Sequence, residues 1–129
     1  MPNKGVINNR GYAAQIRDFR GLQWGTITPT DIDVCVDWHN SKWVLIELKH
    51  NGTELPFGQR LCLERLCDDL QKVKPTLFII AEHNDIPPDD IDAAGAVVIE
   101  YRFKCKWQTT KKGWTVKRCL DWFFEEENR

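Results

Sequence analysis

Long apolar runs are missing from the sequence. The longest are a handful of residues, of which 76–81 (TLFIIA) is an example. A membrane-spanning helix needs about 20 predominantly apolar residues, so the sequence predicts no membrane span. The first twenty residues are polar and lack the apolar stretch of a secretory signal peptide. We therefore expect a cytoplasmic protein.

Cysteine patterns that hold metals or disulfide frameworks are also lacking. The five cysteines are Cys35, Cys62, Cys67, Cys105 and Cys119, with no C-x-x-C pair and no Cys/His group at zinc-ligand spacing. This excludes a zinc finger and a fully paired disulfide scaffold. Cys62 and Cys67 lie among leucines in a helical pattern, which predicts buried thiols in a reducing compartment.

The sequence also lacks an excess of positive or of negative charge. The chain has 18 Lys and Arg against 19 Asp and Glu, a net charge of −1. Dedicated nucleic-acid binders are usually basic, so this balance excludes an indiscriminate polycation. The charges are nevertheless segregated, because one segment holds seven basic and no acidic residues: Arg102, Lys104, Lys106, Lys111, Lys112, Lys117 and Arg118. A nucleic-acid enzyme is therefore not excluded.

Internal repeats, low-complexity tracts and linkers are absent, and 129 residues suit one domain, residues 1–129. Turn residues and hydrophobic periodicity predict three helices, at 9–19, 57–73 and 116–126, the last capped by Thr115. They also predict four strands, at 31–38, 43–49, 76–81 and 96–104. A hairpin, a helix and further strands in this order predict an α/β domain, a mixed β-sheet flanked by helices.

Acidic side chains are concentrated on one face of the predicted hairpin. Side chains alternate along a strand, so Asp31 and Asp33 share a face of the first strand, and Glu47 and Lys49 share a face of the second. Carboxylates brought together on a common face repel each other unless a cation lies between them or one binds a proton. Mg²⁺ and Mn²⁺ prefer such oxygen ligands. The alternative to a metal site is a solvent-exposed face of an edge hairpin. On such a face Glu47 and Lys49 would form pairs across the strands.

This pattern resembles the PD-(D/E)XK nucleases, which have a restriction-endonuclease-like fold. That family carries an acid where one hairpin strand opens and (D/E)-x-K on the next strand. Here Asp33 is followed fourteen residues later by Glu47, Leu48 and Lys49, and the next helix carries Gln59. The resemblance covers 28–81 and is closest in pattern to virus-type replication-repair nucleases and Holliday-junction resolvases.

The resemblance implies a metal-dependent deoxyribonuclease that hydrolyses phosphodiester bonds, with branched or structured DNA among its possible substrates. It implies Mg²⁺ or Mn²⁺ held by Asp33, Glu47 and the carbonyl of Leu48, with Asp31 as the accessory or the primary acid. The implied catalytic residues are Asp33, Glu47, Lys49 and Gln59.

The sequence departs from the family pattern in two places. Many resolvase-like members carry a Glu on an N-terminal helix, whereas no Glu precedes Glu47 here and only Asp18 could substitute. The literal Pro-Asp pair is replaced by Pro29, Thr30 and Asp31.

Partners follow from the charge pattern and the small size. The basic residues that we expect to contact DNA are Lys104, Lys106, Lys111, Lys112, Lys117, Arg60 and Arg17. A chain this short holds little beyond a catalytic core, so we expect a homodimer or a protein partner; the size also suits a phage-encoded protein. Two alternatives stay open: an inactive nuclease-fold module that binds nucleic acid or protein, and an inhibitor of a host factor acting through acidic surfaces.

Overall fold

A computed structural model describes residues 18–110 and 113–125 of the chain. The chain divides into two units, Met1–Thr30 and Asp31–Arg129. In the described part of the first unit, Trp24 and Ile27 exchange two backbone hydrogen bonds, of 2.9 and 3.0 Å. The helix predicted at 9–19 lies outside the described residues except for its last two, which are not helical.

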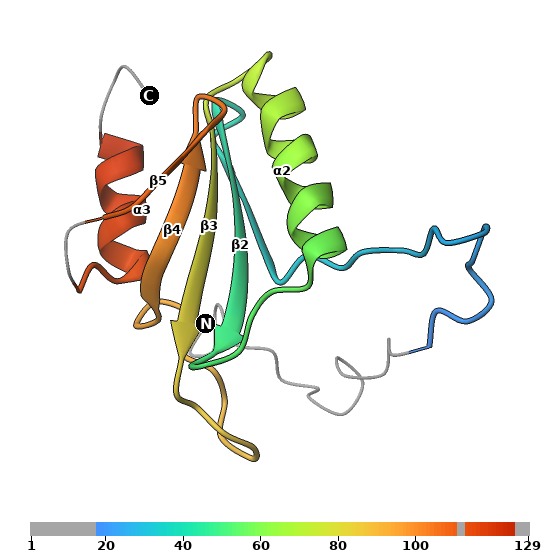
Figure 1. Ribbon diagram of the computed structural model, residues 1–129. Helices are drawn as coiled ribbons and strands as arrows, with labels where there is room; N and C mark the ends of the chain where they lie inside the picture. Colours follow the sequence, from blue (N-terminus) through green and yellow to red (C-terminus); the bar gives the residue numbers. More distant parts are fainter. Residues whose placement is uncertain (1–17, 111–112, 126–129) are drawn as a thin grey trace. The chain divides into compact units, whose positions relative to one another are not determined.

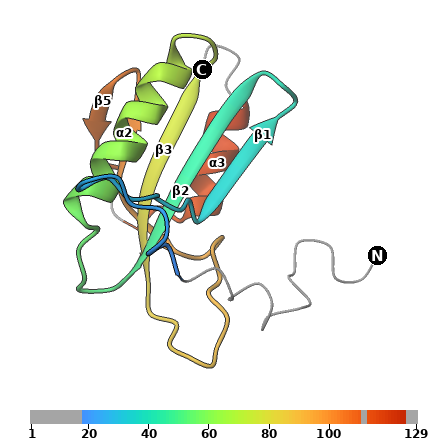
Figure 2. The ribbon, with the colours of Figure 1, turned by 90° about the vertical axis from the view of Figure 1, so that its right-hand side faces the viewer.

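The second unit is a small α/β domain built on a five-stranded mixed sheet, which confirms the predicted class. The strands follow the order β1-β2-β3-β4-β5, and Figure 2 shows β1 at the edge of the sheet beside β2. Strands β2 and β3 are parallel, and every other neighbouring pair is antiparallel. The strand bounds are β1 Val34–Trp38, β2 Lys42–His50, β3 Thr76–His83, β4 Val97–Phe103 and β5 Lys106–Gln108.

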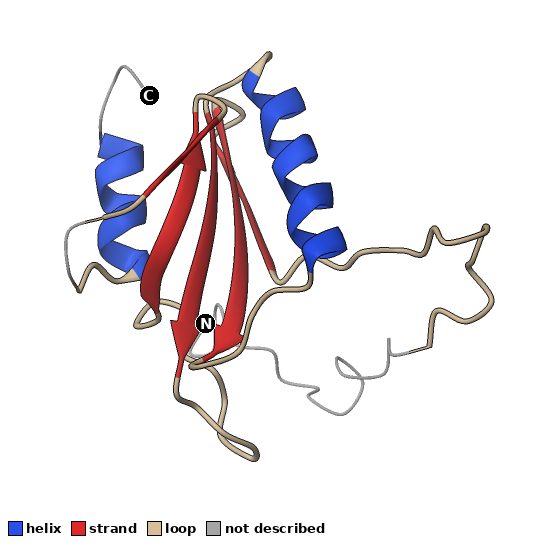
Figure 3. Ribbon diagram, viewed as in Figure 1, coloured by secondary structure: helices blue, strands red, loops and turns tan. Residues whose placement is uncertain are grey.

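Two helices of the described chain cover the two faces of this sheet. Figures 1 and 3 show α2 (Phe57–Gln71) on one face and α3 (Val116–Glu125) on the other. Helix α2 is the connection that a parallel pair such as β2 and β3 requires. The Thr115 hydroxyl accepts the Arg118 N–H at 3.2 Å, so the predicted cap of α3 is confirmed.

Burial on both faces explains the apolar runs of the central strands. Towards α3, the core includes Val44 and Ile46 of β2 and Phe123 of the helix. Towards α2, Leu45 and Phe78 pack against Leu63 and the other buried residues of that helix. Alternate residues of β2 therefore enter different cores, so the strand reads as nearly continuously apolar.

The β1–β2 hairpin is tighter than the sequence predicts. Strand β1 begins at Val34, three residues later than predicted, and β2 begins at Lys42. His39 and Asn40 have φ of 53° and 57°, as both central residues of a type I′ hairpin turn require. The Asp37 carboxylate accepts a hydrogen bond from the Asn40 N–H at 2.9 Å, so this backbone donor of the turn has a partner within the hairpin.

Two details correct the sequence interpretation. Strand β5 was missed because it has only three residues, and the turn before it, Lys104 and Cys105, lacks the usual Asn or Gly although both residues have positive φ.

Cys62 is exposed, whereas its helix neighbours Leu63 and Cys67 are buried. Adjacent helix positions face different directions, so a leucine-rich pattern does not bury every member. All five cysteines are free.

Neither helix of the described chain has the length and apolar content to cross a bilayer.

Candidate functional site

Asp33 and Glu47 form a reciprocal brace where the β1–β2 hairpin opens. The Asp33 N–H donates to Oε2 of Glu47 at 2.8 Å, and the Leu48 N–H donates to Oδ2 of Asp33 at 2.8 Å. The brace follows from the register, which pairs Val34 with Ile46 and so places the preceding residue beside Glu47. The predicted proximity of these two carboxylates is present in the structure.

Gln59 reaches this pair from the first turn of α2. Its side-chain amide donates to Oε1 of Glu47. The sheet places Glu47 on the face that α2 covers, beside Leu45 and the α2-side core. Each oxygen of the Glu47 carboxyl therefore accepts a hydrogen bond from a neutral donor, which is how a polar group is retained in a buried position.

Glu47 is fully buried, with no accessible surface, and has an unusual electrostatic environment. Burial raises its pKa from an ordinary 4.5 to about 7, and the negative charges of Asp33 and Asp31 add to the rise. The hydrogen bonds from the Asp33 N–H and from Gln59 act in the opposite direction. Within the described part of the chain, no Lys, Arg or His forms an ion pair with Glu47.

Lys49 lies on the same face of β2 as Glu47 but is engaged elsewhere. Its ammonium donates to the carbonyl of Thr53 at 2.6 Å and lies 3.5 Å from Oε2 of Glu82. Glu82 is the neighbour of Lys49 in the parallel register. The structure therefore holds the amine towards the β2–α2 loop and β3.

Glu82 is a site residue that sequence reasoning missed. The predicted strand stopped at Ala81, whereas β3 continues to His83. Period-two alternation from Phe78 and Ile80, both in the α2-side core, would have placed Glu82 on the site face. The alternation of the strand, continued two residues beyond Ile80, was the sequence signal that could have identified Glu82.

Asp31 and Asp33 differ in their contacts. The Asp33 carboxylate binds the backbone of β2, whereas exposed Asp31 influences Glu47 through its charge. Asp18, the possible substitute for a helix glutamate, is paired with Arg20 at 2.8 Å in the first unit.

The donor set at this site consists of carboxylate oxygens. No group of three or more His, Cys, Asp and Glu side chains among the described residues is arranged to hold a metal ion. The two carboxylates of Asp33 and Glu47 nevertheless fit a hard divalent cation of the Mg²⁺ type, which binds through one or two protein carboxylates and keeps water and substrate phosphate as its other ligands. Each carboxylate oxygen that accepts one hydrogen bond has a second lone pair for such an ion.

The predicted DNA-contacting residues are distributed over several environments. Arg60 pairs with Glu100 and stacks on Trp107, 4.2 Å from the ring centroid, and Lys117 pairs with Asp121 at 2.6 Å. Lys104 and Lys106 are exposed at the β4–β5 turn. Arg17, Lys111 and Lys112 lie outside the described residues.

The first residue of the basic segment is the most buried of its described members. Arg102 is only 13% exposed and forms ion pairs with Asp68 and Glu64 of α2, at 2.7 and 3.6 Å. Its charge is therefore balanced by two carboxylates, and the side chain serves the packing of α2 against β4.

Comparisons with models of protein families, with curated proteins and with solved structures found no match to this chain.

Proposed function

We propose that this protein is a metal-dependent nuclease that hydrolyses phosphodiester bonds in DNA, and that its domain is a restriction-endonuclease-like fold of the PD-(D/E)XK type. The observation that carries the proposal is Glu47, a fully buried carboxyl whose contacts are an amide, a backbone N–H and, nearby, a second carboxylate. Burying an ionised carboxyl without a basic partner is costly, and the cost is relieved when the group keeps a proton or when a bound cation balances its charge.

Asp33 and Glu47 would hold Mg²⁺ or Mn²⁺, with the Leu48 carbonyl as a further donor on the same strand. When bound, the ion would polarise a phosphate oxygen and lower the pKa of water, which is the chemistry that phosphodiester hydrolysis needs. Gln59 keeps the Glu47 carboxyl in one orientation, and the Leu48 N–H does the same for Asp33.

Lys49 would supply positive charge to the reacting phosphate. In the chain alone its ammonium is held by Thr53 and Glu82. With substrate present, a turn of this long side chain would bring the charge to the attacking water or to the phosphoryl oxygens. Glu82 would then act as the group that holds the amine between reactions.

DNA contact would extend from this site to exposed lysines. Lys104 and Lys106 protrude at the β4–β5 turn, and the proposal assigns them to the phosphate backbone. Because a domain of this size offers few other contacts, a homodimer or a protein partner would complete the selection of branched or structured DNA.

A second candidate is an inactive nuclease-fold module that binds nucleic acid or a protein. Lys49 favours it, because the residue that would assist catalysis is satisfied by Thr53 and Glu82. Such a module would keep the Asp33–Glu47 brace as a purely structural link between β1 and β2.

A cleavage assay distinguishes the two candidates. Supercoiled plasmid and a four-way junction are incubated with the protein and Mn²⁺, with and without a chelator. The nuclease proposal predicts metal-dependent nicking that Asp33→Asn, Glu47→Gln and Lys49→Ala each abolish, whereas Glu54→Gln, in the exposed β2–α2 loop, leaves it unchanged. Absence of cleavage on every DNA form, or full activity of Lys49→Ala, would reject it.

A further inference from the structure

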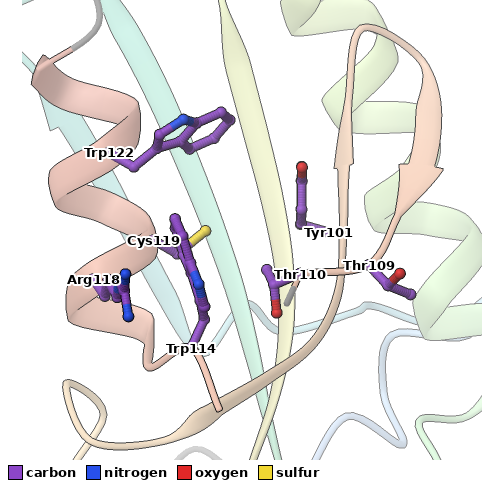
Figure 4. Close-up of a pocket in the computed structure, with 7 residues that line it drawn as sticks. All are labelled: Tyr101, Thr109, Thr110, Trp114, Arg118, Cys119 and Trp122. Atoms are coloured by element: carbon purple, nitrogen blue, oxygen red, sulfur yellow. The ribbon is translucent and has the colours of Figure 1, made fainter. Parts of the chain in front are cut away.

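A cavity of about 330 Å³ lies on the opposite side of the sheet from Glu47. Its walls come from β4, from α3 and from three described residues between β5 and α3, namely Thr109, Thr110 and Trp114 (Figure 4). Tyr101 and Cys119 belong to the core on the α3 side, whereas Glu47 faces α2. The volume falls in the range of pockets that take small molecules, about 300–1,000 Å³.

The lining of this pocket combines flat aromatic surfaces with hydroxyl groups. Tyr101, Trp114 and Trp122 supply three rings, and Thr109 and Thr110 supply two hydroxyls. The Trp122 ring lies 6.0 Å from that of Tyr101, and the Tyr101 hydroxyl donates to Gln108 at 3.2 Å. These contacts hold the aromatic wall in place, so the pocket is largely formed before any ligand binds.

Trp114 and Arg118 form a stacked pair at the edge of the pocket. The guanidinium carbon of Arg118 lies 4.5 Å from the centroid of the Trp114 ring. In Figure 4 the Trp114 indole lies between Arg118 on one side and Tyr101 and Thr110 on the other. A guanidinium stacked on a ring keeps its N–H groups in the plane, directed outwards, where they can still bind a phosphate.

Charge restricts the class of ligand. Among the described residues that line the pocket there is no Asp or Glu, and Arg118 is the single charged one. A quaternary ammonium or another cation, which aromatic cages otherwise favour, would meet this positive charge without a carboxylate to offset it. A purely apolar ligand would cover the half-buried Thr110 hydroxyl without offering it a hydrogen bond and would make no use of the Arg118 charge. A planar ligand with an anionic group satisfies all three features.

We propose that this pocket binds a nucleotide, with its base stacked on Trp114, its base edge hydrogen-bonded by Thr110, and its phosphate bound by Arg118. Base–aromatic stacking tolerates any base, so the pocket would discriminate little between sequences. The same chemistry is offered by a free mononucleotide and by an unpaired nucleotide of a strand. The proposal requires neither a metal nor cleavage, so it stands or falls separately from the nuclease proposal.

Isothermal titration in the presence of a chelator tests it. The probes are AMP, adenosine, inorganic phosphate, a short oligodeoxyadenylate and a blunt hairpin duplex. We expect AMP to bind more tightly than adenosine and much more tightly than phosphate, because stacking and charge act together. Tighter binding of the oligonucleotide than of AMP or the duplex would assign the pocket to unpaired strands, and equal binding of AMP and the oligonucleotide would assign it to free nucleotides.

Variants locate the binding. Arg118→Ala should weaken AMP binding by about tenfold, as expected when a charge-assisted hydrogen bond is removed. Arg65→Ala, at an exposed position of α2, is the matched control and should change nothing. Trp114→Ala should weaken AMP binding at least about fivefold and Trp114→Phe should restore most of it, because phenylalanine keeps a stacking face. Circular dichroism checks that each variant is folded.

Three results would overturn the proposal: no measurable binding of AMP or the oligonucleotide by folded wild-type protein, binding that Arg118→Ala and Trp114→Ala leave intact, or tetramethylammonium binding more tightly than AMP.

Discussion

At the scale of single residues, Glu47 distinguishes this molecule from an ordinary layered α/β domain. Its carboxyl is buried beneath α2, accepts hydrogen bonds from the Asp33 N–H and from Gln59, and has no ion-pair partner in the described chain. The sequence predicted that Asp33 and Glu47 would meet, because strand alternation and a short hairpin constrain both. It could not predict the partners of Lys49, since these depend on how far β3 extends and on how the β2–α2 loop folds.

The raised pKa of Glu47 predicts how stability depends on pH. The folded state, with a pKa of about 7, keeps a proton that the unfolded chain releases near 4.5. The free energy of unfolding of the metal-free protein should therefore be highest near pH 5, fall as pH rises towards 7, and level off above it. Chemical denaturation with a chelator between pH 5 and 8 measures this.

The control is Glu47→Gln, which lacks the titrating group and should flatten that slope. The pKa of Asp68 is lowered by Arg102, so this acid titrates below the window. The pKa values of Cys67 and Cys119 are raised by burial to about 12 and about 11, so these thiols titrate above it. A slope that persists in Glu47→Gln would contradict the assignment.

Gln59 provides a second prediction at this scale. Gln59→Ala removes one neutral donor from a buried carboxyl and should cost about 1–3 kcal/mol of stability. Because the Gln59 hydrogen bond lowers the pKa of Glu47, its removal should move the pH-dependent fall in stability to higher pH. Gln23→Ala, at an exposed position, should leave both unchanged. An unaltered pH profile in Gln59→Ala would show that the amide does not act on Glu47.

At the scale of elements, ion pairs and apolar packing together fix α2 to the sheet. Arg102 of β4 binds Asp68 and Glu64, and the Trp107 indole donates to Glu64 at 2.6 Å. The central strands and both helices were predictable because their apolar patterns are long. Strand β5 was not, because its three residues pair with β4 through tertiary structure and a turn without a strong sequence signal.

Arg102→Ala should therefore destabilise the fold by about 1.5–3 kcal/mol, since it leaves partly buried carboxylates without their partner. Lys72→Ala is the matched control, because the Lys72–Asp69 pair is more than 70% exposed on both sides and should contribute within about 0.5 kcal/mol. Urea denaturation of the two variants compares them. Equal effects would mean that the Arg102 ion pairs do not anchor α2.

At the scale of the whole molecule, a net charge of −1 conceals an uneven distribution. Basic side chains gather in the segment from β4 to α3, but the structure divides them: Arg102 supports packing, Arg118 stacks on Trp114, and Lys104 and Lys106 are exposed. The sequence of this segment is enough to predict its high density of positive charge. It is not enough to predict which carboxylates neutralise part of that charge, because these carboxylates come from other elements.

The proposed DNA contact predicts a salt dependence. Replacing Lys104 and Lys106 together by Ala should weaken DNA binding for every sequence alike and reduce the slope of log affinity against log salt by about 2, one for each phosphate that is no longer neutralised. Fluorescence anisotropy with a chelator measures binding without cleavage. Lys72→Ala serves as the control. An unchanged slope in the double variant would move the DNA-binding surface elsewhere.

The proposed function depends on the binding of a divalent cation by Asp33 and Glu47. Anomalous diffraction from crystals soaked in Mn²⁺ tests it most directly, with wild type and Glu47→Gln measured side by side. We expect a manganese peak within about 2.5 Å of carboxylate oxygens of both residues, absent in the variant. A wild-type crystal saturated with Mn²⁺ that shows no peak there, or a peak that persists in Glu47→Gln, would contradict it.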